Sequence, residues 1–347
     1  MDAADELYPL TFEPIYKEKV WGGRSLEKLG RALPGDKTTR IGESWELADL
    51  ATTSVSGGGG NAEHSVVANG PLAGKTIREL MQTHGEALLG PGVAPSSDGG
   101  FPLLIKFLDA RANLSVQVHP SPEYAAAHRG AHLKSEAWYV IDAAPGAVIY
   151  KGLKPGVTED RLREALRVNT DEAVVPLLNA IEVRAGDCHY LPSGTLHALG
   201  AGVLVAEVQT PSDTTFRVYD WGRTDRELHI EQALACIDFG PEEKGRESFV
   251  ADSRNTIPDP FHSELKAACD HFHLHGVVCS AASREQVRVQ QQSAEIWIGL
   301  EGLAVIVFEG GASLQLVPGL SVLLPAVSSS YRLASQGGGH WLRVTLP

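Results

Sequence analysis

From Phe101 onward the sequence consists of short apolar or alternating runs separated by Gly, Pro and Asp. The runs include FPLLIKFL, LSVQVH, AWYVI, GVLVAEVQ and FRVYDW, and similar ones return near the end in AEIWIGL, LAVIVFEGG and SVLLPAV. Short runs with this punctuation are typical of strands in an all-β barrel or sandwich. We therefore predict a mainly β chain with two barrel units. Residues 1–235 would hold an N-terminal segment and the first barrel, and residues 236–347 the second.

A few helical patterns interrupt the strands. TIRELMQTHGEALLG has helical spacing with Thr76 as N-cap, and Thr158 precedes EDRLREALRV with its acidic first turn. In KVWGGRSLEKLG we expect a turn at Gly22-Gly23 and then a short helix. The glycines of SVSGGGG cannot pack a core, so this stretch is predicted to be a flexible surface insertion.

Composition limits the classes of function. Lys and Arg number 30 against 43 Asp and Glu, a net charge of −13. An acidic chain is a poor general binder of nucleic acid, and an anionic substrate would need a local basic pocket. The start lacks a basic, apolar signal, and no apolar run is long enough to cross a membrane. The four cysteines form no CxxC pair, which favours a reducing compartment. We expect a cytoplasmic protein, monomeric or homodimeric.

Two segments carry candidate metal ligands. In LSVQVHP, strand alternation puts Ser115, Gln117 and His119 on one face. In GDCHYLPSGTLH, a short strand and a bend at glycine present His197 at a fixed point. Glu136 opens the apolar run EAWYVI between them. Zinc, iron and manganese all accept such a mixed set of nitrogen and oxygen ligands. Spacing alone leaves the alternative that these histidines are ordinary core or surface residues.

Charged residues inside apolar runs are the other candidates. Glu207 in VLVAEVQ and Arg217 in TTFRVYDW each need a partner or a cavity. The alternatives are a solvent-facing strand position for Glu207 and a plain salt bridge for Arg217. Lys134 stands two residues before Glu136 and would point to the same side, unless it is a solvated loop lysine. Lys106, in LLIKFL, is expected to be buried.

One segment fits a known family motif. Residues 186–197 match the second motif of cupin barrels, with Pro192 and Gly194 in place before the metal histidine. The chain departs from that motif at Ala201, where cupins have an Asn. The resemblance implies two cupin-like jelly-roll barrels, the second one a degenerate copy.

The first cupin motif is altered in a way that narrows the family. Gln117 replaces a His, and Glu136 follows His119 by 17 residues. The order Gln-x-His, a helical insertion and Lys-x-Glu resembles the type I phosphomannose isomerases. Ordered blocks match the bacterial short form of that family: WGG (21–23), GESWE (42–46), PLLIK (102–106), SVQVHP (115–120), GTLHA (194–198) and SDTTFRVYD (212–220).

The resemblance implies an activity and a set of roles. The activity is the interconversion of D-mannose 6-phosphate and D-fructose 6-phosphate through an enediol, with one metal ion, usually Zn²⁺. The implied ligands are Gln117, His119, Glu136 and His197. The implied catalytic residues are Arg217, Lys134 and Glu207, and the implied substrate-side residues are Lys106, Ser115 and Asp213.

Three other functions stay open at the level of the sequence. A cupin isomerase of an unphosphorylated sugar, such as mannose or lyxose, would use the same metal site without phosphate-binding cations. An iron-dependent oxygenase suits two His and one carboxylate, although Gln117 would occupy an open position. A non-catalytic sugar-binding protein would not need the full set of charged residues. The residue that moves the proton, Lys134 or Glu207, is also left open.

Overall fold

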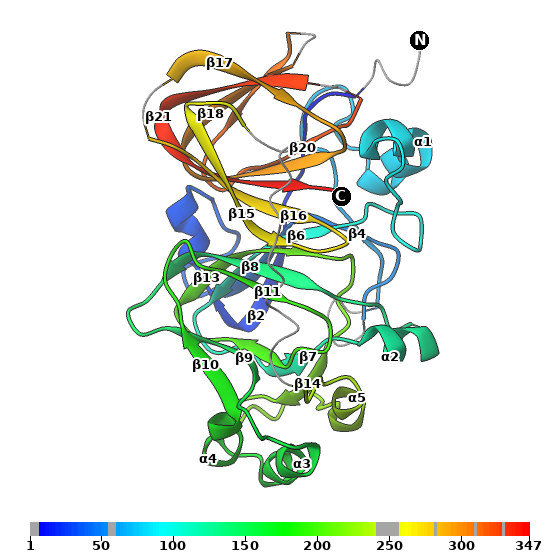
Figure 1. Ribbon diagram of the computed structural model, residues 1–347, viewed down its shortest axis with the longest axis vertical. Helices are drawn as coiled ribbons and strands as arrows, with labels where there is room; N and C mark the ends of the chain where they lie inside the picture. Colours follow the sequence, from blue (N-terminus) through cyan, green and yellow to red (C-terminus); the bar gives the residue numbers. More distant parts are fainter. Residues whose placement is uncertain are drawn as a thin grey trace.

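Two antiparallel sheets that face each other form the first β unit (Figure 1). The computed structural model describes residues 7–54, 60–128, 130–240, 257–280, 283–308, 311–327 and 330–347. In the six-stranded sheet the order is β11 (Cys188–Leu191), β8 (Glu136–Ala143), β13 (Val203–Gln209), β6 (Leu104–Ala110), β2 (Ile15–Gly23) and β3 (Ile41–Leu47). In the five-stranded sheet it is β10 (Leu178–Glu182), β9 (Val148–Leu153), β12 (His197–Leu199), β7 (Val116–Val118) and β14 (Phe216–Tyr219). The prediction of a mainly β fold is confirmed.

The second β unit is one eight-stranded sheet, stacked on the first unit in Figure 1. Its main path is β1 (Leu10–Thr11), β20 (Ser321–Leu324), β18 (Glu295–Phe308), β21 (Ser330–Thr345), β16 (His273–Cys279) and β15 (Phe261–Ala268). The remaining strands are β17 (Ser283–Gln290), which pairs with β21, and β19 (Ser313–Leu316), which pairs with β18. The N-terminal β1 thus joins the C-terminal sheet. The boundary near residue 235 stays a prediction.

The six-stranded sheet is buried on both faces, which explains its nearly continuous apolar runs. On β6, Ile105 and Phe107 pack in a core shared with Leu342 of the second unit. Leu108, on the opposite face, packs inside the first unit. Because side chains alternate along a strand, Lys106 points to the inside with Leu108. Strand alternation therefore directs the lone charge of LLIKFL into the first barrel.

The same alternation directs the charge on β13. Leu204, Ala206 and Val208 contribute to the core shared by the two units, whereas Val205 belongs to the core of the first unit. Glu207 shares the face of Val205 and is almost completely buried. The alternative of a solvent-facing Glu207 is therefore wrong.

Helices occupy the connections between strands. The described α-helices are α1 (Ile77–Leu89), α2 (Pro122–Ala127), α3 (Glu159–Val168), α4 (Asp171–Val174) and α5 (Ile230–Leu234), with 3-10 helices η2 (Ser25–Leu29) and η3 (Val175–Leu177). Thr76 caps α1 in a capping box with Glu79, and Thr158 caps α3, as predicted. A small sheet of β4 (Asp49–Leu50) and β5 (Glu63–His64) lies between β3 and α1 in the sequence.

The predicted turn at Gly22-Gly23 is wrong. Both glycines are the last residues of β2, and Gly22 pairs with Ala110. A Cβ at Gly22 would lie 2.4 Å from the backbone nitrogen of Gly42, so glycine is required for the close approach of β2 and β3. The short helix that follows is the 3-10 helix η2. The predicted flexible loop at SVSGGGG lies largely outside the described residues.

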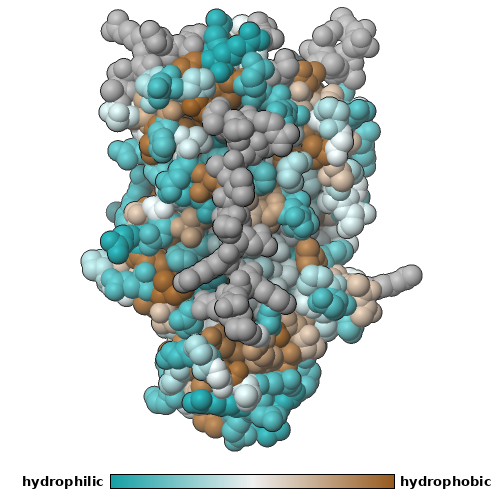
Figure 2. Space-filling model, in the orientation of Figure 1, coloured by the Kyte–Doolittle hydropathy of each residue, from teal (hydrophilic) through white to brown (hydrophobic). Residues whose placement is uncertain are grey.

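Hydrophilic residues are spread over the described part of the face in Figure 2, with smaller hydrophobic areas between them. Among the described residues, the large exposed hydrophobic side chains are Val20, Val168, Val278 and Val317, which belong to separate segments. No helix in the described ranges combines the length and the apolar character needed to cross a bilayer. None of the four cysteines takes part in a disulfide among the described residues.

Candidate active site

Two rows of side chains face each other inside the first β unit. In the five-stranded sheet, Gln117 of β7 lies beside His197 of β12 on one side and Arg217 of β14 on the other. In the six-stranded sheet, Glu207 of β13 lies beside Lys106 of β6. Strand register therefore brings together residues that are up to 111 positions apart in the sequence, from Lys106 to Arg217.

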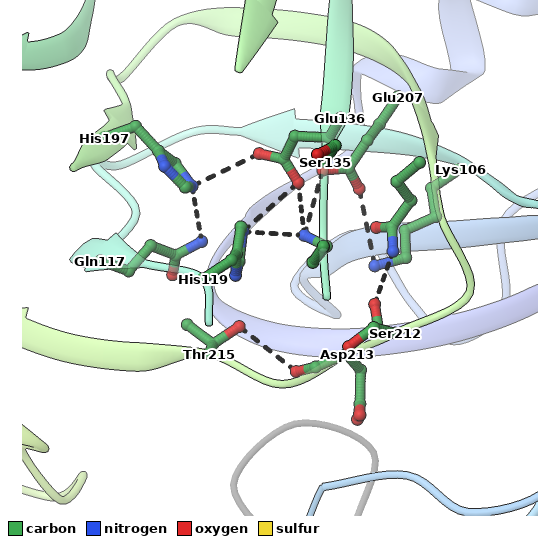
Figure 3. A network of polar contacts seen from close by, with 12 residues as sticks. Lys106, Gln117, His119, Ser135, Glu136, His197, Glu207, Ser212, Asp213 and Thr215 are labelled. Carbon is green, nitrogen blue, oxygen red and sulfur yellow. Dashed lines mark hydrogen bonds and ion pairs between the residues drawn. The ribbon is translucent and has the colours of Figure 1, made fainter. Parts of the chain in front are cut away.

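His119, Glu136 and His197 form the centre of the site (Figure 3). One nitrogen or oxygen atom from each lies within 4.8 Å of the others, and all three side chains are buried. His119 Nε2 is 3.4 Å from Glu136 Oε2, and His197 Nε2 is 3.3 Å from Glu136 Oε1. The cluster joins the start of β8, the start of β12 and the chain just after β7.

The backbone fixes how both imidazole rings present their nitrogens. His119 Nδ1 donates to the carbonyl oxygen of Thr214 at 2.9 Å, and His197 Nδ1 donates to that of Thr195 at 2.8 Å. Burial lowers the pKa of both histidines. Each neutral ring thus carries its proton on Nδ1 and leaves Nε2, which lies near Glu136, as an unprotonated acceptor, the arrangement found in metal-binding histidines.

The donor set fits a divalent cation. Burial raises the pKa of Glu136, but the positive charge of Lys134 outweighs it and the pKa is lowered to about 2, so the carboxylate is ionised. Glu136 Oε1 is buried and accepts no hydrogen bond from the described residues. One carboxylate and two imidazole lone pairs around a common point are typical ligands of zinc and related metals.

Gln117 stands next to this cluster. Its Nε2 is 3.4 Å from His197 Nε2, and its Oε1 accepts a hydrogen bond from Ser115 at 3.2 Å. Rotating the Gln117 amide by half a turn exchanges its oxygen and nitrogen. The hydrogen bond to Ser115 is kept, because the Ser115 hydroxyl can accept from the amide nitrogen as well as donate to the amide oxygen. The amide oxygen then takes the place beside His197.

Lys134 connects the cluster to Glu207. Its ammonium donates to His119 Nε2 at 3.0 Å, forms an ion pair with Glu136 and lies 3.6 Å from Glu207 Oε1. Glu207 also accepts a hydrogen bond from Trp138 Nε1 at 3.2 Å. Lys134 is only about 4% exposed, so it is not a solvated loop lysine.

A pocket opens beside the cluster. Seven of the predicted site residues line it: Lys106, Ser115, Gln117, Lys134, Glu207, Asp213 and Arg217. The other three, His119, Glu136 and His197, lie behind Lys134 and Gln117, with which they are in contact. Five cations and three carboxylates line the pocket, so it has a basic surplus within an acidic protein. The expected local basic pocket is present.

Arg217 is held by the backbone rather than by a carboxylate. Its Nη1 donates to the carbonyl oxygen of Glu227 at 2.9 Å, while its Nε has no hydrogen-bond partner among the described residues. Burial lowers the pKa of Arg217, and the nearby Arg226 adds to that effect. The ion pairs of Asp220 are formed with Arg223 and Arg226, not with Arg217. The alternative of a plain salt bridge from Arg217 to Asp213 or Asp220 finds no support in the described contacts.

Sequence reasoning missed three charged residues of the pocket lining. They are Lys19, Glu43 and Arg226. Glu43 lies within the GESWE block, whose sequence indicates the family but assigns no role to this carboxylate. Lys19 and Arg226 stand in ordinary charged surroundings, and nothing in their local sequence distinguishes them.

Asp213 lies at the edge of the pocket. Its Oδ1 accepts from the backbone nitrogen of Ser54 at 2.7 Å, which ties it to the N-terminal segment. It also borders a larger cavity of about 440 Å³ that is formed partly by Thr52, Ser96 and His271. None of the clustered metal donors lines that cavity. The smaller pocket, not this cavity, therefore adjoins the His119–Glu136–His197 cluster through Lys134 and Gln117.

The fold and the site define a two-barrel protein with a buried site for a metal ion beside a basic pocket. Residues 10–146 match the family model of the catalytic domain of type I phosphomannose isomerase. The chain is 41% identical over 238 residues to the probable mannose-6-phosphate isomerase GmuF of Bacillus subtilis, covering 66% of this chain and 68% of that protein. It is 39% identical over 236 residues to the mannose-6-phosphate isomerase ManA of the same organism, with the same coverage. The chain belongs to the type I phosphomannose isomerase family.

Solved structures extend the likeness over the whole chain. A crystal structure of the mannose 6-phosphate isomerase from Bacillus subtilis superimposes with a TM-score of 0.78 at 29% identity, covering 98% of this chain and 100% of that one. A mutant phosphomannose isomerase from Salmonella typhimurium superimposes with a TM-score of 0.70 at 19% identity, covering 98% and 100%. The second likeness shows the shared fold alone.

Proposed function

We propose that this chain is a mannose-6-phosphate isomerase that interconverts D-mannose 6-phosphate and D-fructose 6-phosphate. The observation that carries the proposal is the buried His119–Glu136–His197 cluster at the end of a basic pocket. A sugar phosphate needs both parts, because its reacting end must be held and its phosphate must meet positive charge. Relatives named as mannose-6-phosphate isomerases support the substrate.

The metal site would be formed by Gln117, His119, Glu136 and His197, with one Zn²⁺ as the proposed ion. A bound divalent cation would polarise the carbonyl of the open-chain sugar and stabilise negative charge on its oxygens. The orphaned Oε1 of Glu136 and the two Nε2 lone pairs support this assignment. Gln117, as a fourth ligand, would take a position that an oxygenase must keep open for oxygen.

The isomerisation moves a hydrogen between C2 and C1 of the open-chain sugar. The C2–H bond of the aldose breaks, the proton passes to a base, and an enediol forms. The same proton then returns to C1, while a hydroxyl proton shifts between O2 and O1. A base must therefore reach the carbon, and an acid must serve the oxygens.

We assign these roles to Glu207 and Lys134. Glu207 Oε2 is buried without a hydrogen-bond donor among the described residues, so it can accept a proton. Lys134 Nζ lies 3.6 Å from the other oxygen of the same carboxylate and beside the metal ligands, where an ammonium can protonate a substrate oxygen. Arg217 faces the same pocket as a permanent positive charge and would steady the enediolate.

The substrate phosphate would bind to those positively charged side chains of the pocket that lie farther from the metal ligands. Arg226 is fixed in place by Asp220, which accepts from its Nε at 2.8 Å. Arg226 and Lys19 line the pocket together with Arg217, and Ser115 and Asp213 complete the substrate-side set. An isomerase of an unphosphorylated sugar would have no need of this positive surplus.

A coupled assay of mannose 6-phosphate conversion to fructose 6-phosphate tests the proposal. Turnover is expected with the phosphorylated sugar, with little on free mannose, and a chelator should abolish it until Zn²⁺ is restored. Equal turnover of mannose and mannose 6-phosphate would contradict the substrate. Full activity after complete removal of metal would contradict the metal site. We also propose a cytoplasmic location, and the monomer or homodimer state stays a prediction.

A further inference from the structure

Five charged side chains of alternating sign lie in a row along the pocket wall, here called the file: Lys19, Glu43, Lys106, Glu207 and Lys134. Lys19 Nζ lies 3.1 Å from Glu43 Oε1, and Glu43 Oε2 lies 3.7 Å from Lys106 Nζ. Lys106 Nζ lies 3.5 Å from Glu207 Oε2, and Glu207 Oε1 lies 3.6 Å from Lys134 Nζ. The file runs from the partly exposed Lys19 to the buried neighbourhood of the metal ligands. Because neighbouring charges in the file have opposite sign and lie no more than 3.7 Å apart, removing one charge changes the electrostatic environment of the next.

Glu43 is the carboxylate of this file that is farthest from the metal ligands. Besides Lys19, it accepts a hydrogen bond from Trp45 Nε1 at 2.7 Å. Burial raises its pKa, but Lys19 and Lys106 together outweigh burial and lower the pKa to about 2. Glu43 is therefore a fixed negative charge, and its bonds to Lys19 and Trp45 keep it in place.

Lys106 is held between two carboxylates without bonding closely to either. Its separations of 3.7 Å from Glu43 and 3.5 Å from Glu207 are both longer than a normal N–H···O hydrogen bond, which spans about 2.7–3.2 Å. The ammonium also lies 4.9 Å from the ring centroid of Trp45. The two carboxylates thus attract the ammonium from both sides at similar distances, and Lys106 lines the pocket.

We propose that Glu43 is a positioning residue that holds the Lys106 ammonium away from Glu207 and available to the sugar. The inference rests on the proposed function of the same pocket. Glu43 acts through Lys106, and its own oxygens are already occupied by Lys19 and Trp45.

The consequence of losing the Glu43 charge follows from the geometry. Without it, the attraction of Glu207 on Lys106 is unopposed, and the ammonium moves into direct hydrogen-bond contact with Glu207. The sugar then loses a donor, and the proposed proton acceptor is partly occupied. Because both changes act on the reacting geometry, kcat should fall more than KM rises.

Two substitutions at Glu43 separate charge from packing. Glu43→Gln keeps the size of the side chain and an oxygen for Trp45 Nε1 but removes the charge. Glu43→Asp keeps the charge but shortens the side chain. A packing role would make Gln the milder change, whereas positioning by charge makes Asp the milder one.

Glu46→Gln is the matched control. Glu46 lies on the same strand, is buried, and pairs with Arg31, which also contacts the Gly319 carbonyl of the second unit. It does not line the pocket. This variant removes a buried carboxylate charge from β3 without touching Lys106.

Steady-state kinetics with mannose 6-phosphate and crystal structures of the variants provide the test. We expect Glu43→Gln to lower kcat by about 10- to 100-fold, as for a small displacement in a reacting site, with metal content unchanged. Glu43→Asp should retain more activity than Glu43→Gln, and Glu46→Gln should keep the wild-type kcat. In the Glu43→Gln structure, Lys106 Nζ should lie within hydrogen-bond distance of Glu207.

Either of two results would overturn the proposal: Lys106 unmoved in the Glu43→Gln structure, or Glu43→Asp as inactive as Glu43→Gln. Failure of the proposed function would show differently, as a wild-type protein that does not convert mannose 6-phosphate. In that case the displacement of Lys106, seen by crystallography, still decides whether Glu43 positions it.

Discussion

Replacing Glu207 with Gln removes a charge on which two buried lysines depend. The carboxylate oxygens lie 3.5 Å from Lys106 Nζ and 3.6 Å from Lys134 Nζ. At an effective dielectric constant of about 20, each pair attracts by about 5 kcal/mol. Part of this lost attraction is offset, because burying a neutral Gln side chain costs less desolvation free energy than burying a carboxylate. Breaking a buried pair from one side costs about 3–5 kcal/mol, and we expect a loss of unfolding free energy of that size.

Two measurements follow from this variant. The melting temperature should fall by roughly 6–20 °C, using the usual relation between stability and melting temperature for domains of 150–250 residues. At a temperature where the variant is folded, kcat should fall by at least about 100-fold, because the proposed base is gone. Metal content should stay close to one ion per chain, since Glu207 is not among the proposed ligands.

Glu295→Gln is the matched control for this experiment. Glu295 is a buried carboxylate in the second unit, where it accepts from Arg343 Nε at 2.8 Å and from Tyr331 at 2.7 Å. Its loss should destabilise the fold by a similar amount but leave kcat of the folded protein unchanged. If Glu207→Gln keeps the wild-type stability, the reasoning about the ion pairs is wrong. If it keeps the wild-type kcat, Glu207 is not the base.

Three further predictions concern separate groups. His197→Ala should strip the metal and the activity together, and a variant with normal metal content by elemental analysis would remove His197 from the ligands. Arg217→Ala should lower kcat by about 100- to 1000-fold with metal content unchanged, as for loss of an oxyanion donor, and surviving turnover would contradict its role. Burial, with Arg343, lowers the pKa of His275 to about 4, so the unfolded chain takes up a proton first as pH falls below about 6.5. Stability should therefore drop by about 2 kcal/mol between pH 7 and pH 5, and chemical denaturation should show that His275→Leu reduces this drop.

Much of the fold follows from local sequence. The helices after Thr76 and Thr158 were predictable because an N-cap and helical spacing act within a few residues. The strands were predictable because short apolar or alternating runs between Gly, Pro and Asp are also a local pattern. Gly22 was misplaced because its requirement for glycine comes from the backbone of Gly42, on another strand, and no local pattern reports that contact.

The sequence by itself also determined the candidates for the site, through Gln-x-His, Lys-x-Glu and single charges in apolar runs. It could not say that Glu207 and Lys106 face the inside of the first barrel. That depends on which face of the six-stranded sheet packs on the second unit.

Only the tertiary structure decided which charges balance one another. Glu43 and Lys106 are 63 residues apart, and their pairing depends on the register of β3 beside β6. Arg226 reaches the pocket because Asp220 fixes its guanidinium. A charge in a sequence is local, but its electrostatic effect depends on distances through space, and those are set by strand pairing and burial.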